Sequence, residues 1–273
     1  QPNAMGGREV GGLANQLAAH MDFASEDVDR VRRFWRAPCL TKSPGQKAVE
    51  LFEDVHSGRI KALWVIATNP AVSMPNADRV RDAIVKCDFV VVSDVVSTSD
   101  TLKLGHVRLP ATAWGEKNGT VTNSERRISR QRSFLKPPGE ARHDWDITSD
   151  VARRMGYSGF DYASPAEVFR EYAQLTAFEN NGSRDLDLGG VSDVSDEDYE
   201  ALAPFQWPRP MSSASPAGRR DKGQHRFFAD GRFYTTSGKA RFIATPDSNP
   251  QNLPSDEYPL ILNTGCIRDQ WHT

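Results

Sequence analysis

The sequence predicts an α/β fold in which a parallel β-sheet is flanked by helices. Two short, continuous apolar runs, 62–67 and 89–92, are typical of strands that are buried on both faces. The segment 77–87 between them has helical spacing, and strand, helix and strand in succession form a βαβ unit. A length of 273 residues with 38% hydrophobic residues is enough for one large or two ordinary domains.

Two segments before this unit also show helical spacing. Apolar residues fall on one stripe over 13–21, which predicts a helix there. The charged and aromatic segment 22–36 is expected at the surface, and no active group stands out in it. Residues 47–57 predict a second helix, and Gly58 is placed where a glycine commonly caps a helix C-terminus.

The alternation of helices and strands continues beyond the unit. The further predicted elements are, in order, a short helix over 98–105, a strand over 107–109, loops over 110–138, a helix over 144–155 closed by Gly156, and a helix beginning at Ser164. Ser164, Pro165 and Glu167 match a capping box with proline in the first turn, which predicts where that last helix begins.

The composition changes in the last third of the chain. Residues 180–224 are rich in Asn, Asp, Pro, Ser and Ala, which predicts a long irregular surface connection with one short helix near 196–202. Two strand-like segments, 232–236 and 240–244, then predict a β-hairpin because a glycine-containing turn separates them. Residues 258–262 predict one further strand.

Charge and composition exclude several classes of function. A net charge of -2 argues against a protein that grips nucleic acid by bulk charge. The sequence contains no run of about 18 apolar residues that would span a membrane. Its 3 cysteines are too scattered for a disulfide framework, which favours a reducing, cytoplasmic location, and the histidines lack metal-ligand spacing. Because the first residue is Gln1, we expect the chain to be an internal part of a longer protein.

The residues that follow the predicted strands are candidates for a binding site, because open parallel sheets bind ligands at the carboxyl ends of their strands. Asn69 follows the first strand, and Ser93 and Asp94 follow the second. A carboxylate there can accept hydrogen bonds from a ribose or a guanine edge, although strand-end aspartates also commonly cap the next turn. Ordinary NAD binding is disfavoured, because the Gly-x-Gly-x-x-Gly fingerprint is missing after the first strand.

Three later segments add candidate groups. Lys117 lies in a glycine-rich, charged segment and can neutralise a diphosphate, but such a loop can also be held by its own ion pairs. Asp144 opens a predicted helix, where a carboxylate commonly serves as a cap. Residues 263–273 follow the last predicted strand and are dense in hydrogen-bonding groups, although such strand ends often form ordinary turns.

Several motifs occur together in one order along the chain. They are Ala67–Ser73, Val91–Asp94, Leu109–Ala111, Trp114–Thr120, Asn263–Gly265 and Trp271–Thr273. In this order they resemble the catalytic subunit of the molybdopterin oxidoreductases related to dimethyl sulfoxide reductase. The segments 1–11 and 126–131 add a resemblance to the bacterial assimilatory nitrate reductases.

The resemblance implies a fold and a division into domains. It implies a Rossmann-like parallel-sheet domain with flanking helices, then a long irregular connection, then the first strand of a C-terminal β-barrel. The implied parts are 1–45, a helical lead-in from the preceding part of the subunit; 46–178, an α/β domain that binds molybdopterin guanine dinucleotide; 179–255, the connection with the hairpin; and 256–273, the truncated start of the barrel.

The resemblance also implies the chemistry of the longer protein. Family members carry molybdenum in bis(molybdopterin guanine dinucleotide), and the nitrate reductases add a 4Fe-4S cluster whose ligands would lie outside this chain. The implied reaction is the reduction of nitrate to nitrite in nitrate assimilation, with electrons from a donor protein or domain. Two alternatives remain: a formate dehydrogenase-like molybdoenzyme of the same superfamily, and a stand-alone nucleotide-binding or interaction module.

Residue roles follow from the resemblance in two groups. Asn69 would contact the cofactor, Ser93 and Asp94 would hold a guanosine end, Lys117 would face phosphate or guanine, and Asp144 would make a further contact. The second group would surround the pterin and diphosphate: Thr264, Gly265, Arg268, Trp271, His272 and Thr273. Cys266 stands where the family usually has arginine, so Arg268 is a candidate replacement. No catalytic residue and no metal ligand is expected in this chain.

Overall fold

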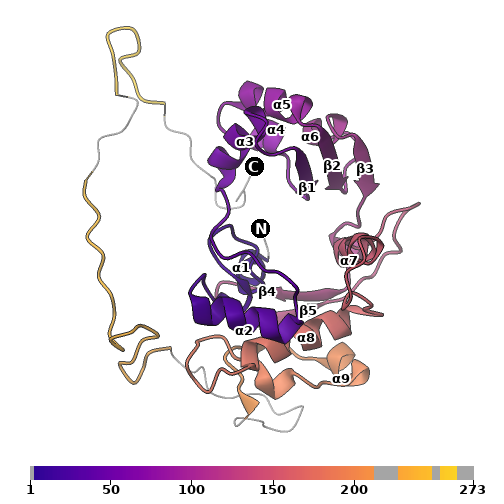
Figure 1. Cartoon of the computed structure of the whole chain (residues 1–273), viewed down its shortest axis with the longest axis vertical. Coiled ribbons are helices and arrows are strands. Elements are labelled where there is room, and N and C mark those ends of the chain that lie inside the picture. Colours follow the sequence, from indigo (N-terminus) through magenta and orange to yellow (C-terminus); the bar gives the residue numbers. More distant parts are fainter. Residues whose placement is uncertain (1–2, 212–226, 248–252, 263–273) are drawn as a thin grey trace. The chain divides into compact units, whose positions relative to one another are not determined.

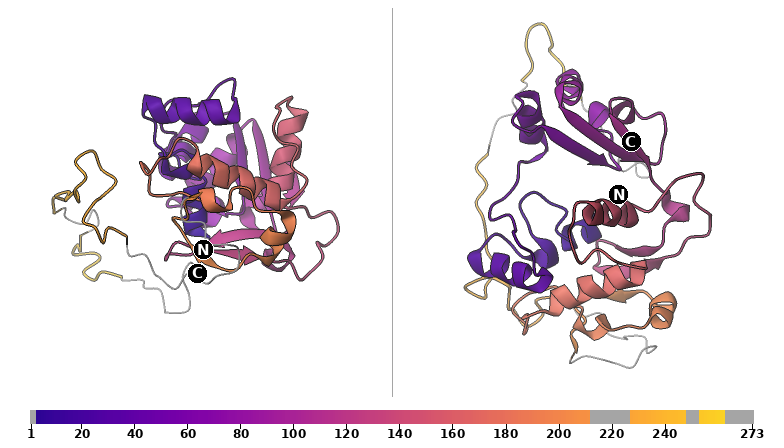
Figure 2. Two further views of the ribbon diagram at one scale, coloured as in Figure 1. Left: turned by 90° about the horizontal axis from the view of Figure 1, so that it is seen from below. Right: turned by 45° about the vertical axis from the view of Figure 1, so that its right-hand side comes forward.

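The computed structural model describes residues 3–211, 227–247 and 253–262. Contacts divide the chain into two units: the first is Asn3–Asp221, and the second is Lys222–Thr273 together with Gln1–Pro2. Every helix and strand found in the described residues belongs to the first unit (Figures 1 and 2). None of these helices is both long and apolar enough to cross a membrane.

A parallel three-stranded sheet forms at the predicted positions. Its strands are β1 (Ala62–Ile66), β2 (Phe89–Asp94) and β3 (Val107–Pro110), in the spatial order β1-β2-β3. Helix α5 (Ala77–Lys86) connects the first two strands, and the short α6 (Asp100–Lys103) connects the second to the third. The predicted alternation of strands and helices is therefore confirmed.

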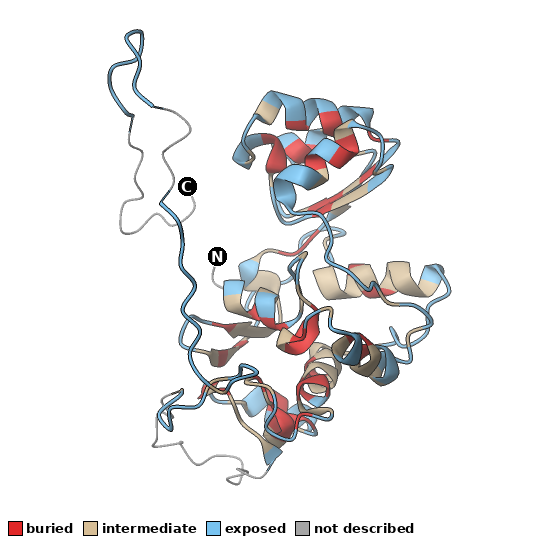
Figure 3. Ribbon diagram, turned by 60° about the vertical axis from the view of Figure 1, so that its left-hand side comes forward, coloured by how far each residue is buried: buried red, intermediate tan, exposed pale blue. Residues whose placement is uncertain are grey.

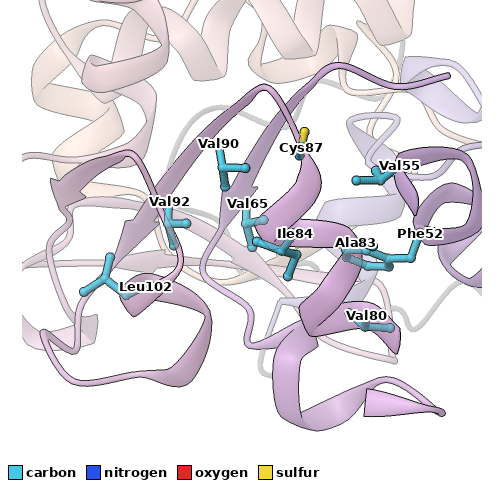
Figure 4. Packing of buried hydrophobic residues seen from close by; sticks show 10 residues of the cluster. All are labelled: Phe52, Val55, Val65, Val80, Ala83, Ile84, Cys87, Val90, Val92 and Leu102. Carbon is cyan, nitrogen blue, oxygen red and sulfur yellow. The ribbon is translucent and has the colours of Figure 1, made fainter. Parts of the chain in front are cut away.

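The main core lies between one face of this sheet and the helices α3 (Ala48–His56), α5 and α6. Val65, Val90 and Val92 point from the strands toward these helices, because alternate residues of a strand face the same side (Figure 4). The helices contribute Phe52 and Val55 from α3, Val80, Ala83 and Ile84 from α5, and Leu102 from α6.

The opposite face of the sheet is also apolar but is largely open in the described structure. Ile66, Phe89 and Val107 are exposed by 38%, 49% and 37%. Figure 3 colours the chain by burial and shows exposed and intermediate residues beside buried ones along these strands. Parallel sheets are normally covered on both faces, and this is why their strands have continuous apolar sequences. The strand sequences therefore fit a sheet with two covered faces, whereas the described residues cover mainly one.

Glycine ends two of the helices as predicted. Gly58 follows α3 with φ +76°, and Gly156 follows α7 (Asp144–Arg154) with φ +86°. After α3, the backbone N–H groups of Gly58 and Arg59 donate to the carbonyls of Val55 and Asp54, both at 3.0 Å. This is the Schellman arrangement, which satisfies helix carbonyls and requires a left-handed residue that glycine adopts without strain.

Helix α8 (Pro165–Ala177) begins where the capping box was predicted, but neither of the two hydrogen bonds of the box is seen among the described residues. The Glu167 carboxylate accepts a hydrogen bond from the backbone N–H of Ala163 at 2.7 Å. The Ser164 hydroxyl is buried and has no hydrogen-bond partner among the described residues. Glu167 therefore fixes the entry to α8, while Ser164 does not act as a side-chain cap.

The N-terminal region differs from the prediction. The expected helix over 13–21 is wrong: the segment contains only a 3-10 turn (Ala18–His20), and Ala19 adopts φ 58°. Leu17 and Met21 are nevertheless buried, so the apolar spacing reflects burial and not helix formation. The helices are instead α1 (Ala4–Glu9) and α2 (Ser25–Trp35).

Helix α2 lies within 22–36, the segment for which the sequence predicted only a surface position. It is amphipathic: Val28 and Val31 are buried in a small core that includes Leu175 of α8, and charged residues occupy its other face. The charged residues of this segment therefore form the exposed face of a helix whose other face is packed in a core.

A second, antiparallel sheet lies where loops were predicted. Strands β4 (Gly119–Thr122) and β5 (Arg127–Gln131) form a hairpin, and β6 (Phe205–Gln206) pairs with β5. The side-chain oxygen of Asn123 accepts hydrogen bonds from the N–H groups of Glu125 and Arg127 and so forms the turn. Helix α8 packs against β4 (Figure 2).

The first part of the predicted surface connection is packed into this unit. The predicted short helix is confirmed as α9 (Asp196–Ala201), and a 3-10 turn precedes it at Gly189–Val191. Leu186, Leu188 and Trp207 are buried. Residues 180–211 therefore belong to the fold and do not simply run over its surface.

The described residues of the second unit contain no strand. The predicted hairpin is wrong there: in place of a ladder, the N–H of Phe233 donates to the Gly238 carbonyl within a local turn. Residues 258–262 also form no strand, and Leu260 is 87% exposed. A strand needs a neighbouring strand for its backbone groups, and the described residues provide no partner strand for this segment. No barrel is seen in the described residues, and 263–273 lie outside them.

Candidate functional site

The carboxyl edge of the β1–β3 sheet gathers the candidate residues of the first group. Asn69 comes three residues after β1, and Asp94 is the last residue of β2, where it pairs with Pro110 of β3. Beyond β3, Ala111 forms a parallel bridge with Arg142, so the segment leading to Asp144 runs along the same edge. Residues from four separate segments therefore follow one edge of one sheet.

Asn69 is anchored by a residue from the neighbouring loop. Its Oδ1 accepts hydrogen bonds from the hydroxyl of Thr101 at 2.7 Å and from the backbone N–H of Thr101 at 3.1 Å. Thr101 lies in the first turn of α6, whose N–H groups lack partners within the helix. Asn69 therefore caps α6 and also precedes its own short helix α4 (Pro70–Ser73).

The backbone that delivers Asn69 to this edge is strained. Ala67, directly after β1, adopts φ 55°, a left-handed conformation that alanine rarely occupies. Its N–H still donates to the Ser93 carbonyl at 3.0 Å, so the parallel ladder continues to the turn. Strain of this kind costs about 1–3 kcal/mol and commonly persists beside functional residues.

Ser93 is buried, and its hydroxyl makes a hydrogen bond within the sheet. Its hydroxyl oxygen accepts a hydrogen bond from Trp64 Nε1 of β1 at 2.9 Å. Ser93 and Trp64 lie on the same face of neighbouring strands. In this structure Ser93 therefore ties β2 to β1 at the edge of the sheet.

Asp94 organises the loop that follows β2. Its Oδ1 accepts hydrogen bonds from the N–H groups of Val95 and Val96 at 2.7 and 3.2 Å, and its Oδ2 accepts one from the Ser99 hydroxyl at 2.6 Å. A carboxylate oxygen can accept about two hydrogen bonds. Oδ1 is therefore fully used, and Oδ2 keeps one acceptor position for another donor.

Lys117 and Asp144 meet in a direct ion pair. Lys117 Nζ lies 2.6 Å from Asp144 Oδ2, and the two side chains are about 29% and 30% exposed. The pair joins the segment after β3 to the first residue of α7. The neighbouring Glu116 carboxylate accepts a hydrogen bond from the backbone N–H of Ala113.

One oxygen of this pair remains without a partner. Asp144 Oδ1 is buried and has no hydrogen-bond partner among the described residues. The adjacent His143 contacts the hydroxyl of the buried Thr112 through Nδ1 at 3.0 Å. A buried carboxylate oxygen normally has a donor, so the site leaves a position that a ligand N–H or O–H can fill.

Arg142 braces the same segment. Its guanidinium donates to Asp146 and Asp150 of α7. These hydrogen bonds raise the pKa of Arg142 well above its usual value, and those from Arg142 and Arg154 lower the pKa of Asp150. The start of α7 is therefore held in place by charge-assisted contacts.

The structure places the predicted residues as follows. Asn69, Ser93, Asp94, Lys117 and Asp144 lie along one edge, but only Lys117 and Asp144 contact each other among the bonds seen. Thr264, Gly265, Arg268, Trp271, His272 and Thr273, like Cys266, lie outside the described residues. Within the described residues, no group of three His, Cys, Asp or Glu side chains is placed to hold a metal ion.

The sequence interpretation missed the residues that support the site. Trp64, Ser99, Thr101 and Thr112 each hydrogen-bond a candidate residue or its neighbour. The only available signal was that Ser99 and Thr101 follow the second strand, as candidate residues do. Nothing in the spacing linked Thr101 to Asn69, which lies 32 residues earlier.

Comparison with known proteins identifies the family to which these residues belong. The family model described as molybdopterin oxidoreductase matches residues 3–154. A nitrate reductase of Klebsiella oxytoca is 49% identical, with 100% of this chain and 30% of that protein covered. The assimilatory nitrate reductase catalytic subunit of Bacillus subtilis is 32% identical, and the F420-dependent formate dehydrogenase subunit alpha of Methanocaldococcus jannaschii is 30% identical. In both comparisons, 100% of this chain aligns with 37% of the length of the relative.

The chain spans about a third of the length of these curated relatives. The residues matched by the family model include the whole carboxyl edge from Asn69 to Asp144. The chain belongs to the molybdopterin oxidoreductase family.

Proposed function

We propose that this chain is the part of a nitrate reductase that holds a guanosine end of Mo-bis(molybdopterin guanine dinucleotide). The observation that carries the proposal is the row of polar side chains from Asn69 to Asp144 along the carboxyl edge of a parallel sheet, within the matched residues. The nitrate reductases among its relatives support the substrate. The longer protein would reduce nitrate to nitrite in nitrate assimilation.

The residues at this edge fit a guanosine diphosphate group. The Asn69 amide nitrogen has no partner among the described residues and can donate, and Lys117 keeps two N–H groups beyond the one directed at Asp144. These donors suit phosphate oxygens. Asp94 Oδ2 and the buried Asp144 Oδ1 have acceptor positions left for guanine N–H or ribose O–H groups.

The cofactor, when bound, supplies the two-electron chemistry in which nitrate, two electrons and two protons give nitrite and water. The contribution of this chain is binding and orientation. Lys117 compensates phosphate charge, and Asp144 fixes the Lys117 ammonium group. Ser93 and Asp94 hold the end of β2 in position through Trp64 and Ser99.

The proposal extends to parts that the described residues do not include. Residues 264–273 would surround the pterin and diphosphate of a guanine dinucleotide, with Arg268 compensating for Cys266. The longer protein would carry a 4Fe-4S cluster, receive electrons from a donor protein or domain, and act in the cytoplasm.

A formate dehydrogenase-like molybdoenzyme is the second candidate function, because a relative 30% identical over the whole chain carries that name. The two candidates share the cofactor and differ in substrate. Purified full-length protein should oxidise reduced methyl viologen with nitrate and show no formate-dependent reduction of benzyl viologen. The reverse pattern would favour the formate enzyme.

Cofactor binding at the sheet edge is tested in the full-length protein. Asp94→Ala and Lys117→Met each remove a side-chain group that would hydrogen-bond the cofactor. We therefore expect about tenfold weaker cofactor retention in each variant. The measurements are molybdenum content and the GMP released by acid hydrolysis. Asp82→Ala, an exposed carboxylate on α5, is the matched control. Wild-type molybdenum and GMP in both site variants would contradict the proposal.

A further inference from the structure

The orientation of the Asn69 amide is fixed by a group that can only donate. The backbone N–H of Thr101 lies 3.1 Å from one terminal atom of the Asn69 side chain. A backbone N–H has no acceptor capacity, so that atom must be the oxygen. The usual ambiguity between oxygen and nitrogen in an asparagine side chain is therefore removed here.

The Thr101 hydroxyl reinforces this orientation in the same direction. Its oxygen accepts from the backbone N–H of Ala71 at 3.1 Å, and it lies 2.7 Å from Asn69 Oδ1. Because Ala71 can only donate, the single hydroxyl proton of Thr101 is left for Asn69. Thr101 is fully buried, so water does not compete for these bonds.

Asn69 is left with hydrogen-bond donors alone. Both acceptor positions of its oxygen are filled by Thr101, and its NH₂ group has no partner among the described residues. The residue is half-buried at the carboxyl edge of the sheet. Asp94, at the end of the neighbouring strand, has the opposite polarity, because an ionised carboxylate only accepts.

We propose that Thr101 is a positioning residue that makes Asn69 a dedicated donor, so that the cofactor atom facing Asn69 is a hydrogen-bond acceptor. That acceptor is a phosphate oxygen or the O6 or N7 atom of guanine, and not a guanine N–H. The inference rests on the proposed function and names the polarity of one contact within it.

The donor role is tested by Asn69→Asp in the full-length protein, which keeps the size of the side chain but removes its donors. An acceptor opposite Asn69 predicts about tenfold weaker retention of the cofactor, measured as GMP released by acid hydrolysis. A clearly greater deficit for Asn69→Asp than for Asn69→Ala assigns the acceptor to phosphate, because the new carboxylate and the phosphate repel each other as like charges. Comparable deficits for the two variants assign it to the uncharged guanine. Retention equal to wild type would overturn the inference.

The positioning role is tested by a double-mutant cycle with Thr101→Val and Asn69→Ala. If Thr101 acts through Asn69, Thr101→Val weakens GMP retention in the wild type but has no further effect beside Asn69→Ala. Thr101→Ser keeps the hydroxyl and should retain the cofactor. Equal losses from Thr101→Val in both backgrounds would show a merely structural role and overturn the positioning claim.

Two controls keep the outcomes separate. Thermal unfolding of each variant, measured in parallel, shows whether loss of cofactor follows from loss of fold. Asp94→Ala and Lys117→Met report on the proposed function independently. If these two lose the cofactor while Asn69→Asp retains it, the inference about Asn69 fails and the proposed function stands. If none of them loses it, the proposed function fails first.

Discussion

Glu9 lies in a segment for which the sequence suggested no special role, yet its carboxylate is buried, with only 1% of the residue exposed. Oε1 accepts from Trp207 Nε1 at 2.6 Å, and Oε2 accepts from the hydroxyls of Thr122 and Tyr172 at 2.8 and 3.0 Å. Burial, together with the charge of Glu9, raises the pKa of Tyr172 well above its usual value, so Tyr172 remains a donor. One residue of α1 thus joins β4, α8 and the segment after β6.

We expect Glu9→Leu to destabilise the protein by about 3 kcal/mol or more, because three buried donors would lose their acceptor. Glu9→Gln should cost only about 1 kcal/mol, since its oxygen can serve Trp207 while the two hydroxyls rotate to accept. Urea denaturation measures both. Glu50→Leu, at an exposed position of α3, is the control and should stay within about 0.5 kcal/mol. Equal stability of Glu9→Leu and Glu50→Leu would contradict this role.

At the level of elements, two serines that precede helices behave differently. Ser195 caps α9, because its hydroxyl oxygen accepts from the backbone N–H of Asp198 at 3.0 Å. Ser164 precedes α8 in a sequence that matches a capping box, but its hydroxyl has no partner among the described residues. The sequence motif located the helix start correctly and misassigned the residue that stabilises it.

Ser195→Ala should therefore cost about 1 kcal/mol, the usual value for a lost side-chain cap. Ser164→Ala should change stability by less than about 0.5 kcal/mol or increase it slightly, because it removes a buried hydroxyl without a partner. The two variants serve as controls for each other in urea denaturation. A larger loss from Ser164→Ala than from Ser195→Ala would refute the observed capping pattern.

The strands illustrate what kind of pairing a sequence predicts. β1 and β2 were identified from their own apolar runs, because a parallel strand buried in a sheet needs apolar side chains along its length. β4 and β5 were missed, since their charged and polar residues face neighbours that come from elsewhere. Arg130 of β5, for example, is buried beside Tyr199 of α9, with its guanidinium 4.0 Å from the centre of the tyrosine ring.

Over the whole Asn3–Asp221 unit, ion pairs tie together helices that are far apart in sequence. Arg33 of α2 hydrogen-bonds Glu179 after α8, and Arg79 of α5 hydrogen-bonds Glu53 of α3. These bonds lower the pKa values of Glu179 and Glu53. Burial acts to raise the pKa of Asp185, but the contact with His20 and hydrogen bonds from backbone N–H groups together outweigh burial and lower it.

These shifts predict acid destabilisation in a defined window. A carboxyl group with a lowered pKa in the folded state stabilises that state above its ordinary pKa, here 3.8 for Asp and 4.5 for Glu. The stability is lost as the pH falls through the lower folded-state value. The urea midpoint should therefore change little from these groups between pH 7 and 5 and fall below about pH 4.5.

The acid loss is checked with Glu179→Gln, which cannot titrate and should show a smaller fall in the urea midpoint between pH 5 and pH 3. Glu50→Gln, which removes an exposed carboxyl group, is the matched control. Because the Glu179 pair is exposed, its contribution should shrink in 0.5 M NaCl. An identical acid profile for Glu179→Gln and Glu50→Gln would show that this ion pair contributes nothing.

The sequence alone determined the parallel sheet, the helix between its strands, the glycine caps and the position of candidate residues at the strand ends. Each of these is local: hydrophobic spacing records which side of an element is buried, and the turn residues adjoin the element they end. The resemblance in motif order also identified the family, which the comparison confirmed.

Only the tertiary structure decided which of those candidates meet and what holds them. Lys117 pairs with Asp144, which is 27 residues away, and Asn69 is oriented by Thr101, which is 32 residues away. The tertiary structure also buries Glu9 beside Trp207, which lies 198 residues later in the chain. Hydrogen bonds of this kind depend on where the folded backbone brings two segments together, and residue type and spacing along the chain do not record that position.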